Sequence, residues 1–328
     1  MQLSFKQVNK SFGDNHVLKD LSFHAESGKA FGLLGRNGAG KTTSIRILMN
    51  VFAPDSGDVV VDGKSILNKK EDVRSFGYLP EEKGLYPKYQ ILHQMIYIGS
   101  LRGLSRREAK ANARYWLDRL DMLQYQNRKL ETLSKGNQQK IQLAVCLITN
   151  PELVILDEPF SGLDPVNSQL LRDVVKDLVD AGKLVLFSSH QMTYVESFCD
   201  QIAILDQGEI VLSGSIKEVK RSYPRDTLSI RLGTAQASLP PEETKALVEQ
   251  LQASNALSCP VHNIRCTLDG ILLELEGAEQ KDQLLRDLVQ LDTPIERFEV
   301  VEPSLEDIFV RTTSRAEVKS PIEEEEHV

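Results

Sequence analysis

Cysteine is scarce in this sequence, and long apolar stretches and an excess of basic residues are missing. Its four cysteines are scattered over 328 residues, too few and too widely spaced for a disulfide framework in a chain of this size. No run approaches the roughly 18 consecutive apolar residues of a membrane-spanning helix. The N-terminal segment MQLSFKQVNK lacks the apolar core of a signal peptide. We therefore expect a protein of a reduced, cytoplasmic compartment that neither spans a membrane nor is secreted.

The charge balance is acidic, with 39 Lys and Arg against 47 Asp and Glu and a net charge of −8. This balance argues against a nucleic-acid partner, because binding to a phosphate backbone requires an excess of Lys and Arg. Part of the acidity belongs to residues 314–328, which include four consecutive glutamates. Hydrophobic residues make up 41% of the chain, enough for the cores of roughly two domains.

The chain up to about residue 222 alternates between strand-like and helix-like segments. Strand-like patterns cover 3–8, 17–24, 29–34, 153–158, 183–189 and 201–206. The first two are separated by turn residues and predict an antiparallel pair. Residues 44–51 and 168–182 have helical spacing, and residues 90–149 contain further helical patterns that predict an insert. Strands that alternate with helices predict a parallel sheet covered by helices.

A change of pattern near Ser222-Tyr223-Pro224 divides the chain. Beyond it, short strand-like segments alternate with helical ones, which is typical of a small α+β domain. Ser304 and Asp307 have the spacing of a capping box for a last short helix. The predicted divisions are a first domain at 1–222 with a helical subdomain at about 82–150, an accessory α+β domain at 224–313, and a disordered acidic tail at 314–328.

The glycine-rich segment GRNGAGKTT follows an apolar strand and precedes a helical pattern. Its spacing, Gly35-x4-Gly40-Lys41-Thr42, is that of a phosphate-binding loop. The glycines allow backbone N–H groups to turn around a phosphate, and the helix N-terminus adds a positive dipole. We expect Lys41 to reach the β- and γ-phosphates and the Thr42 hydroxyl to ligate Mg²⁺. Thr43 either helps to bind the α-phosphate or only begins the helix.

The strand-like segment LVIL ends in two carboxylates, Asp157 and Glu158. Such an apolar strand lies inside a parallel sheet, and its carboxyl end faces the crevice where these sheets bind ligands. There Asp157 suits a direct or water-mediated contact with Mg²⁺, and Glu158 suits the activation of an attacking water. An apolar run ending in Asp-Glu is common by itself, but together with a phosphate-binding loop it indicates a nucleotide-hydrolysing site.

Further segments complete a recognisable pattern. LSKGNQQ begins at Leu133, SGLD begins at Ser161, SSH ends at His190, and an aromatic, Phe12, precedes the phosphate-binding loop. In this order and spacing the motifs resemble the signature (usually LSGGQ), the D-loop, the switch histidine and the adenine-stacking aromatic of the nucleotide-binding subunits of ABC transporters. The resemblance covers roughly residues 1–220 and is more specific than any single motif. It implies an α/β fold: a P-loop ABC cassette of mixed sheet core, antiparallel β subdomain and helical insert.

The resemblance also implies that two such subunits close head to tail over ATP. Ser134 and Gly136 of one subunit are then expected to contact the γ-phosphate of ATP held by Lys41 of the other, because a helix start offers a hydroxyl and open N–H groups. Ser134 would otherwise be only a helix N-cap, and His190 is either a contact of the γ-phosphate and Glu158 or a structural histidine.

The residues expected to bind ATP are Phe12, Gly35, Arg36, Asn37, Gly38, Ala39, Gly40, Lys41, Thr42, Thr43, Ser134 and Gly136. The expected Mg²⁺ ligands are Thr42, Asp157 and Glu81, and the expected catalytic residues are Glu158, His190, Lys41 and Glu81.

The sequence departs from the family pattern in three places. FGYLPEE puts Glu81 where the family usually carries Gln, and a carboxylate there can still bind Mg²⁺ directly or through water. Lys135 replaces the first glycine of the signature and Asn137 its glutamine, but Gly136 is kept. The segments YLPEE and PSLEDIF are similar to those of ATPase subunits in the bacterial type-2 exporter group, which includes drug and sodium extruders.

We therefore expect an ATPase subunit, peripheral at the cytoplasmic face of the membrane, that couples dimer closure to export through separate membrane-spanning subunits. The sequence leaves open whether the second ATP-binding subunit is identical or different, and it does not name the transported substrate. Two other functions remain open: a soluble ABC ATPase of translation or DNA repair, and a regulatory module that binds ATP without turnover. Glu81 and Lys135 favour the regulatory module, whereas Lys41 and Glu158 favour the ATPase.

Overall fold

The computed structural model describes residues 1–328 except 69–74, 83, 162, 235–237, 291–293 and 319–328. The chain divides into two compact units, one formed by Met1–Lys217 with Arg311–Val328 and the other by Glu218–Val310. Within the described residues, no helix is both long and apolar enough to cross a bilayer.

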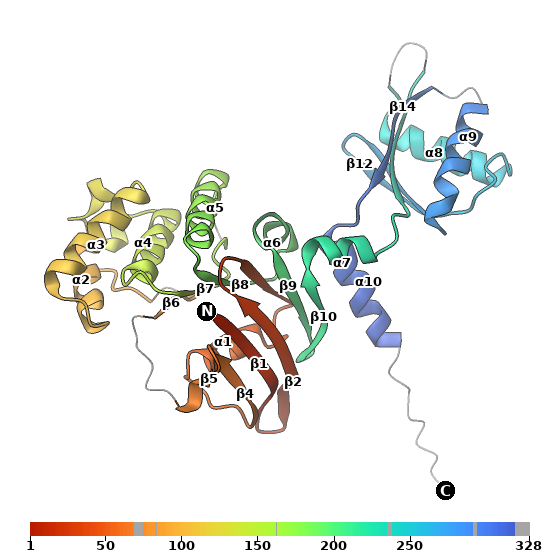
Figure 1. The fold of residues 1–328 in the computed structure, drawn as a ribbon. Helices are drawn as coiled ribbons and strands as arrows, with labels where there is room; N and C mark the ends of the chain where they lie inside the picture. The colour runs from red at the N-terminus through yellow and green to blue at the C-terminus, as the bar shows by residue number, and fades with distance from the viewer. Residues whose placement is uncertain (69–74, 83, 162, 235–237, 291–293, 319–328) are drawn as a thin grey trace, which may run out of the picture. The chain divides into compact units, whose positions relative to one another are not determined.

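The first unit contains an antiparallel sheet that opens the chain (Figure 1). Its strand order is β2 (Asn15–Glu26), β1 (Gln2–Phe12), β4 (Ser56–Val61) and β5 (Lys64–Ser65). The expected hairpin is confirmed, because β1 and β2 are antiparallel with Phe12 opposite Asn15. Leu3, Phe5 and Val8 of β1 are buried in the core of this unit.

A second, largely parallel sheet forms the centre of the same unit. Its order is β10 (Glu209–Ser215), β9 (Gln201–Asp206), β3 (Ala30–Leu34), β8 (Leu184–Ser189), β7 (Leu153–Asp157) and β6 (Phe76–Leu79), with β10 alone antiparallel. Every residue of β3, β7 and β8 is buried, as expected for strands covered on both faces. The carboxyl ends of β3, β6, β7 and β8 meet at one edge of the sheet, which places the segments that follow them side by side.

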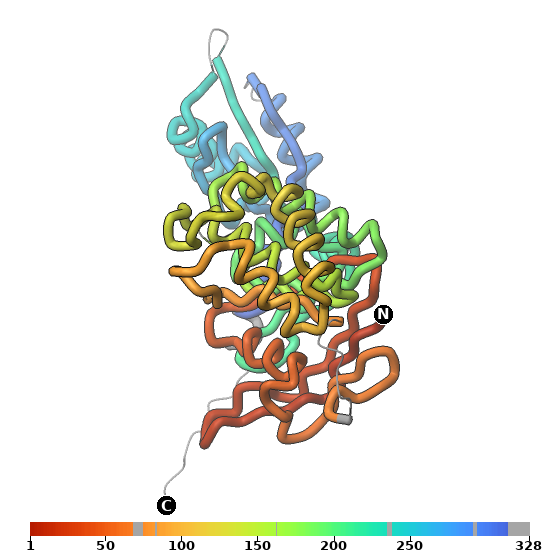
Figure 2. Tube along the Cα trace, turned by 90° about the vertical axis from the view of Figure 1, so that its left-hand side faces the viewer, coloured from red at the N-terminus to blue at the C-terminus, as the bar shows by residue number. Residues whose placement is uncertain are grey.

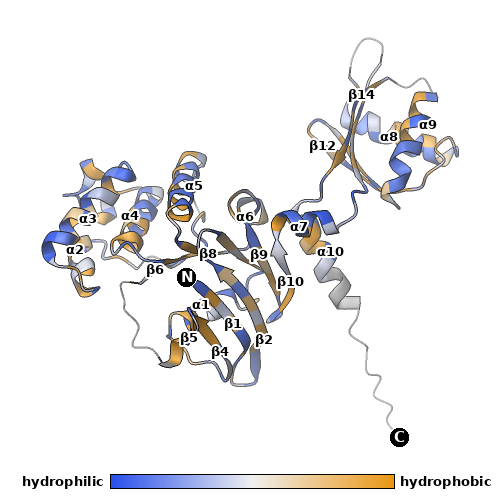
Figure 3. Cartoon of the chain, viewed as in Figure 1, coloured by the Kyte–Doolittle hydropathy of each residue, from blue (hydrophilic) through white to orange (hydrophobic). Residues whose placement is uncertain are grey.

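Helices of the first unit pack around this sheet or form a lobe beside it. Those that accompany the sheet are α1 (Lys41–Leu48), α5 (Pro165–Asp180) and α6 (Met192–Phe198), and the lobe consists of α2 (Ile91–Leu101), α3 (Arg106–Arg119) and α4 (Lys135–Leu147). The helix α7 (Ile216–Ser222) spans the boundary between the two units. Figures 1 and 2 show the lobe as one group of helices, which confirms the expected helical insert. Most of these helices carry hydrophobic and hydrophilic residues in alternation (Figure 3), as helices with one buried face do.

Two helix starts differ from the expected ones. The helix α1 begins at Lys41 rather than at residue 44, directly after the glycine loop. The helix α5 begins at Pro165 rather than at residue 168, because the Asp164 side chain accepts a hydrogen bond from the Asn167 N–H at 2.9 Å and proline is favourable in the first turn.

The second unit contains a four-stranded antiparallel sheet with a helix in each of two connections between its strands. The elements are β11 (Thr227–Leu232), α8 (Pro241–Ala253), β12 (Val261–Thr267), β13 (Gly270–Leu275), α9 (Lys281–Gln290) and β14 (Ile295–Val301), and the strand order is β12-β13-β11-β14. This βαββαβ order is ferredoxin-like. Apolar residues of the strands and of both helices form a core of their own, from Leu228 to Leu288.

The last helix, α10 (Leu305–Val318), has the expected capping box. The Ser304 hydroxyl accepts from the Asp307 N–H at 3.1 Å, and an Asp307 carboxylate oxygen accepts from the Ser304 N–H at 3.2 Å. The prediction that disorder begins at residue 314 is wrong for the backbone up to Val318, because a helix once started gains a hydrogen bond for each added residue and this stretch contains no Gly or Pro. The rest of the predicted tail, 319–328, lies outside the described residues.

Candidate functional site

A cavity of about 400 Å³ opens where the carboxyl ends of the central strands meet. It is lined by Val17, Asn37, Gly38, Gly40, Lys41, Thr42, Thr43, Glu81, Asp157 and Glu158. Residues from the glycine loop, from the strand-end carboxylates of β7 and from the segment after β6 therefore face one space, although they lie far apart in the sequence.

The glycine loop adopts a backbone that requires glycine. Gly38 and Gly40 have φ angles of 85° and 112°, in the left-handed region. A Cβ atom at Gly40 would lie 2.6 Å from a Leu18 methyl group and 3.1 Å from the Val17 carbonyl oxygen. The helix α1 has no side chain capping its first turn, so its free N–H groups are left for an anion.

The Lys41 ammonium group is buried at the base of the loop. Its Nζ donates to the carbonyl oxygens of Gly35 at 2.7 Å and Arg36 at 3.2 Å, and it lies 3.9 Å from Glu158 Oε1. Burial lowers the pKa of Lys41, and the carboxylates of Glu158 and Asp157 oppose this shift. The cation is therefore held between the loop carbonyls and the acidic side of the cavity.

Asp157 is tied to the strands on both sides of β7. Its Oδ1 accepts a hydrogen bond from the Ser188 hydroxyl of β8, and its Oδ2 accepts one from the Tyr78 hydroxyl of β6 at 3.3 Å. Burial raises the pKa of Asp157, against the effect of the Ser188 hydrogen bond. Burial and the nearby Asp157 charge raise the pKa of Tyr78 to about 12. The aspartate is thus fixed in position while its charge is poorly solvated.

Glu158 has an unusual backbone and several hydrogen-bond donors. Its φ angle is 47°, which costs energy for any residue with a Cβ. Its Oε1 accepts from the His190 N–H at 2.9 Å and lies 2.7 Å from His190 Nδ1, and its Oε2 accepts from the Ser189 hydroxyl at 3.1 Å. His190 therefore contacts Glu158, as one of the two predictions for this histidine expected.

Several of the expected site residues do not line the cavity. Phe12 is 45% exposed at the end of β1, with its ring edge-on to Phe52 at a centroid distance of 5.4 Å. Lys10 Nζ lies 5.5 Å from the centroid of the Phe12 ring. Four other expected residues lie next to the cavity but do not line it: Gly35, Arg36, Ala39 and His190.

Ser134 and Gly136 lie at the start of α4 and also outside the lining of the cavity. The Ser134 hydroxyl accepts from the Asn137 N–H at 3.4 Å, which is the N-cap arrangement. A Cβ atom at Gly136 would lie 2.9 Å from the Asn167 side-chain nitrogen. The start of the signature helix therefore packs against the start of α5, next to the D-loop segment, of which Gly162 lies outside the described residues.

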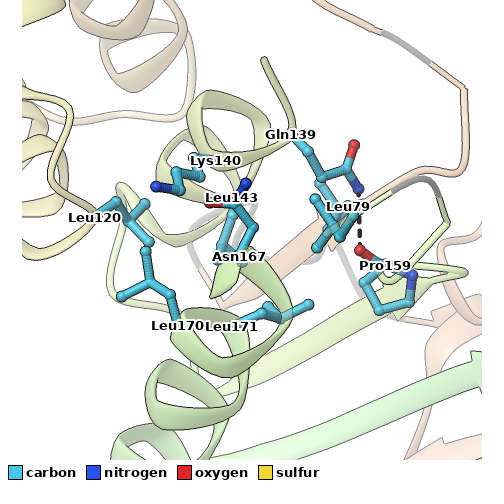
Figure 4. A pocket seen from close by; sticks show the side chains of 10 residues that line it. Leu79, Leu120, Gln139, Lys140, Leu143, Pro159, Asn167, Leu170 and Leu171 are labelled. Atoms are coloured by element: carbon cyan, nitrogen blue, oxygen red, sulfur yellow. Dashed lines mark hydrogen bonds between the residues drawn. The ribbon is translucent and has the colours of Figure 1, made fainter. Parts of the chain in front are cut away.

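A small apolar cavity of about 10 Å³ lies between α4 and the beginning of α5 (Figure 4). Leucine side chains from both helices converge on it, and at one side the Gln139 amide donates to the Pro159 carbonyl at 3.5 Å. The signature helix is thus attached to the segment that directly follows Glu158.

Four residues that shape this site were not predicted from the sequence. Val17 lines the cavity from β2, while Tyr78, Ser188 and Ser189 donate to the two carboxylates. Val17 belongs to no motif, and Tyr78 belongs to the quoted segment FGYLPEE, in which only Glu81 was assigned a role. Ser188 and Ser189 belong to the quoted SSH segment. Their contacts with the two carboxylates could have been predicted by placing β8 next to β7 in the sheet.

A parallel sheet whose edge presents a glycine loop, a buried lysine and paired strand-end carboxylates defines an ATPase of the P-loop type. Residues 18–161 match the family model described as ABC transporter, and residues 214–313 match the one described as the C-terminal domain of DrrA1-3-like ATP-binding proteins. The ABC transporter ATP-binding protein YhaQ of Bacillus subtilis is 37% identical to this chain over 94% of the chain and 97% of its own length. The chain belongs to the ATP-binding proteins of ABC transporters.

Other comparisons agree with this family. The linearmycin resistance ATP-binding protein LnrL of Bacillus subtilis is 30% identical over 95% of this chain and 98% of its own length. The solved structure of an ATP-binding subunit of an ABC transporter has a TM-score of 0.62 and 27% identity, and covers 68% of this chain and 93% of that one. The expected fold class and the expected ATP-binding, ATP-hydrolysing activity are confirmed at the level of the family.

Proposed function

We propose that this chain is the ATP-hydrolysing subunit of an exporter and binds separate membrane-spanning subunits at the cytoplasmic face of the membrane. The observation that carries the proposal is the cavity that Lys41 shares with Glu81, Asp157 and Glu158. The direction of transport is inferred from the names of two relatives, one concerned with linearmycin resistance and one with export. The second is the Nod factor export ATP-binding protein I of Paraburkholderia xenovorans, 29% identical over 95% of this chain and 97% of its own length.

The glycine loop would hold the phosphates of ATP. Its N–H groups and Lys41 lie at the start of α1, and the Lys41 ammonium would exchange the carbonyls of Gly35 and Arg36 for phosphate oxygens. Asn37, Gly38, Gly40 and Thr43 line the same space. Phe12 is exposed enough to offer a ring face to the adenine base.

Thr42, Asp157 and Glu81 fit a Mg²⁺ ion bound together with ATP. They line one cavity and offer a hydroxyl and carboxylates, the hard oxygen ligands that Mg²⁺ prefers. In the described part of the chain no three His, Cys, Asp or Glu side chains form a metal site by themselves, which suits an ion that takes its other ligands from phosphate and water. When bound, Mg²⁺ would neutralise charge on the phosphate oxygens.

Glu158 is the proposed general base, and His190 its partner. The Glu158 carboxylate is 7% exposed and lies between the ammonium of Lys41 and the imidazole of His190. In this position it would orient the attacking water and accept its proton. The His190 side chain remains 42% exposed, so it would remain accessible to the γ-phosphate.

Ser134 and Gly136 are proposed to act on the ATP of a second subunit. Both lie at the start of α4, where Ser134 is exposed and Gly136 partly buried, outside the lining of the cavity of their own chain. A helix start provides N–H donors and a hydroxyl for a phosphate, and a head-to-tail partner would bring one to it. The partner is either a second copy of this chain or a related subunit.

The membrane-spanning subunit is proposed to dock on residues 82–104. The loop before α2 and the exposed side of α2 form a hollow of about 530 Å³ lined by Tyr86, Tyr89, His93, Gln94 and Tyr97. Tyr97 and Leu101, one helical turn apart, are 55% and 66% exposed. Exposed aromatic and aliphatic side chains around a hollow are typical of a protein-binding surface.

Cysteine cross-linking in the assembled transporter tests the docking. The chain with Cys266→Ser has only its three buried cysteines left, and Tyr97→Cys adds one exposed thiol on α2. We expect a covalent adduct with a membrane-spanning subunit at Tyr97→Cys. The matched control is Tyr115→Cys on α3, whose side chain is 63% exposed and lies outside 82–104. Equal adducts at both positions, or none at Tyr97→Cys, would contradict the docking surface.

A further inference from the structure

Four aromatic side chains meet directly behind the Glu158–His190 pair. Phe160 follows Glu158 by two residues, Phe187 lies on β8 just before His190, and Tyr194 and Phe198 lie on α6 just after it. We call this group, Phe160, Phe187, Tyr194 and Phe198, the aromatic cluster. It therefore joins the two chain segments that carry the proposed base and its histidine.

Phe160 is the centre of the aromatic cluster. Its ring is stacked on Tyr194 at a centroid distance of 4.5 Å with an interplanar angle of 11°, on Phe198 at 4.7 Å and on Phe187 at 5.2 Å. Phe160 is 3% exposed and Phe187 is fully buried. Arg172 of α5 lies over the Phe198 ring at 4.7 Å and closes one side of the cluster.

The backbone between the cluster and the site is short and under strain. Glu158 has its φ angle of 47°, a conformation that persists only where the surroundings hold it. Its N–H donates to the Ser188 carbonyl at 3.0 Å, and its own carbonyl accepts from the Ser161 N–H at 3.1 Å. Phe160 lies inside the turn that this second hydrogen bond closes and, like Pro159, is buried, so a shift of its ring would be transmitted to Glu158.

We infer that the aromatic cluster is a positioning device, in which Phe160 and Tyr194 hold Glu158 and His190 at hydrogen-bond distance. The inference rests on the proposed roles of Glu158 and His190 in hydrolysis. Neither ring touches the cavity, so both residues act through the pair rather than on ATP. The stacked rings hold the turn after β7 against β8 and α6, and stacked rings have a preferred geometry that aliphatic side chains lack.

Substitutions of Tyr194, which is only partly buried, test this inference in the assembled transporter. Tyr194→Leu removes the flat ring but keeps an apolar side chain, and Tyr194→Phe keeps the ring. We expect Tyr194→Leu to lower kcat for ATP hydrolysis by about 10- to 100-fold, the range for a misplaced catalytic group, with little change in KM or in the equilibrium binding of ATP. Tyr194→Phe should retain the wild-type kcat.

A matched aromatic elsewhere controls for general loss of stability. Phe23 is 8% exposed and stacks on Phe5 at 4.4 Å and on Phe31 at 5.2 Å in the core beside the antiparallel sheet. Phe23→Leu should lower the Tm without lowering kcat. The inference is overturned if Tyr194→Leu lowers Tm alone, or if Phe23→Leu and Tyr194→Leu reduce kcat equally.

Failure of this inference is distinguishable from failure of the proposed function. If Glu158→Gln abolishes hydrolysis while Tyr194→Leu leaves kcat unchanged, Glu158 keeps its role and the aromatic cluster is ordinary core packing. If Glu158→Gln hydrolyses ATP at the wild-type rate, the proposed function of Glu158 itself is wrong and the positioning device has nothing to position.

Discussion

The starts of α1 and α4 make an instructive pair, because both offer helix N–H groups and both carry a lysine as first residue. Lys41 of α1 is buried and faces Glu81, Asp157 and Glu158 across a cavity. Lys135 of α4 is exposed, and the neighbouring Ser134 caps its own helix. The first helix start has its chemical partners within the chain, and the second presents donors at the surface. The difference supports an ATP-binding site at the start of α1 and a surface at the start of α4 that contacts the ATP of another subunit.

The largest effect should follow from removing the proposed base. Glu158→Gln keeps the size and the hydrogen-bonding capacity of the side chain but removes the carboxylate that faces Lys41 and His190. We expect ATP hydrolysis to fall by roughly 10²–10⁴, the usual contribution of a general base, while ATP still binds. Phosphate release by the assembled transporter and equilibrium binding of labelled ATP measure the two properties separately.

A control for Glu158→Gln lies at the opposite end of the same strand. Glu152 immediately precedes β7, and its carboxylate pairs with Lys183 Nζ at 2.7 Å, far from the cavity lining. Glu152→Gln should hydrolyse ATP at the wild-type rate. If Glu158→Gln does so as well, the carboxylate is not the base and another group activates the water.

Lys41→Ala should weaken the binding of ATP at the start of α1. The substitution removes a buried ammonium placed where the β- and γ-phosphates are proposed to lie, so we expect the affinity for ATP to fall. Loss of one electrostatic donor to a transition state also lowers kcat, typically by roughly 10²–10³. Titration with a fluorescent ATP analogue measures the affinity. Lys183→Ala is the control, because Lys183 is also buried, with 8% of its surface exposed, but donates a hydrogen bond to Glu152. This variant should have a lower Tm and an unchanged affinity for ATP. Wild-type affinity in Lys41→Ala would show that the glycine loop does not hold the phosphates as proposed.

A substitution at Ser134 should impair dimer formation and not the binding of ATP, in contrast to Lys41→Ala. In the Glu158→Gln background ATP is not consumed, so a closed dimer should accumulate with ATP and Mg²⁺. Adding Ser134→Arg should abolish this dimer while leaving ATP bound to the subunit, because the bulky cation blocks the approach of α4 to the facing γ-phosphate. Size-exclusion chromatography detects the dimer, and occlusion of ATP replaces it as the measurement in the full complex.

Ser105 provides a control of the same geometry. It caps α3 as Ser134 caps α4, with its hydroxyl accepting from the Glu108 N–H at 3.2 Å. Ser105→Arg should therefore cost a similar amount of helix stability, about 1 kcal/mol, without affecting the dimer. Loss of the dimer in both variants would indicate a capping effect and would contradict a role of Ser134 in the facing site.

The features that the sequence predicted are those in which the local pattern and the tertiary position agree. Alternation identified β1 and β2, a continuous apolar run identified β7, and the glycine loop identified the binding helix, although its start was placed at residue 44 instead of Lys41. The short elements β5, β6 and α6 were not anticipated, because they span too few residues to show a period.

Within the site, residue types could be predicted but their geometry could not. The Asp-Glu pair could be placed at the end of a strand, but nothing in the sequence reveals that Glu158 adopts a left-handed backbone. The stacking of Phe160 on α6 is equally hidden, since it depends on the packing of α6 beside β8. A sequence fixes local propensity, whereas such contacts arise only when distant segments are brought together.

The smallest effect on the ATP site is expected from deleting residues 224–328. Each unit has its own core: the apolar cluster around the sheets of the first unit runs from Leu3 to Leu205, and that of the second from Leu228 to Leu288, with no residue in common. All residues that line the cavity belong to the first unit. Because domains with separate cores fold independently, the remaining chain should be folded and bind ATP within about twofold of the full chain.

The deletion also removes Arg311–Val318 of α10, which groups with the first unit, so a modest fall in Tm is expected. A second variant that lacks only residues 319–328 keeps α10 and should retain the full Tm. Circular dichroism follows folding, and titration with a fluorescent ATP analogue follows binding. An unfolded product of the longer deletion would contradict the predicted domain division. A folded product with a greatly weakened affinity for ATP would instead show that the accessory domain supports the cavity, and the site in the first unit would then not be complete without it.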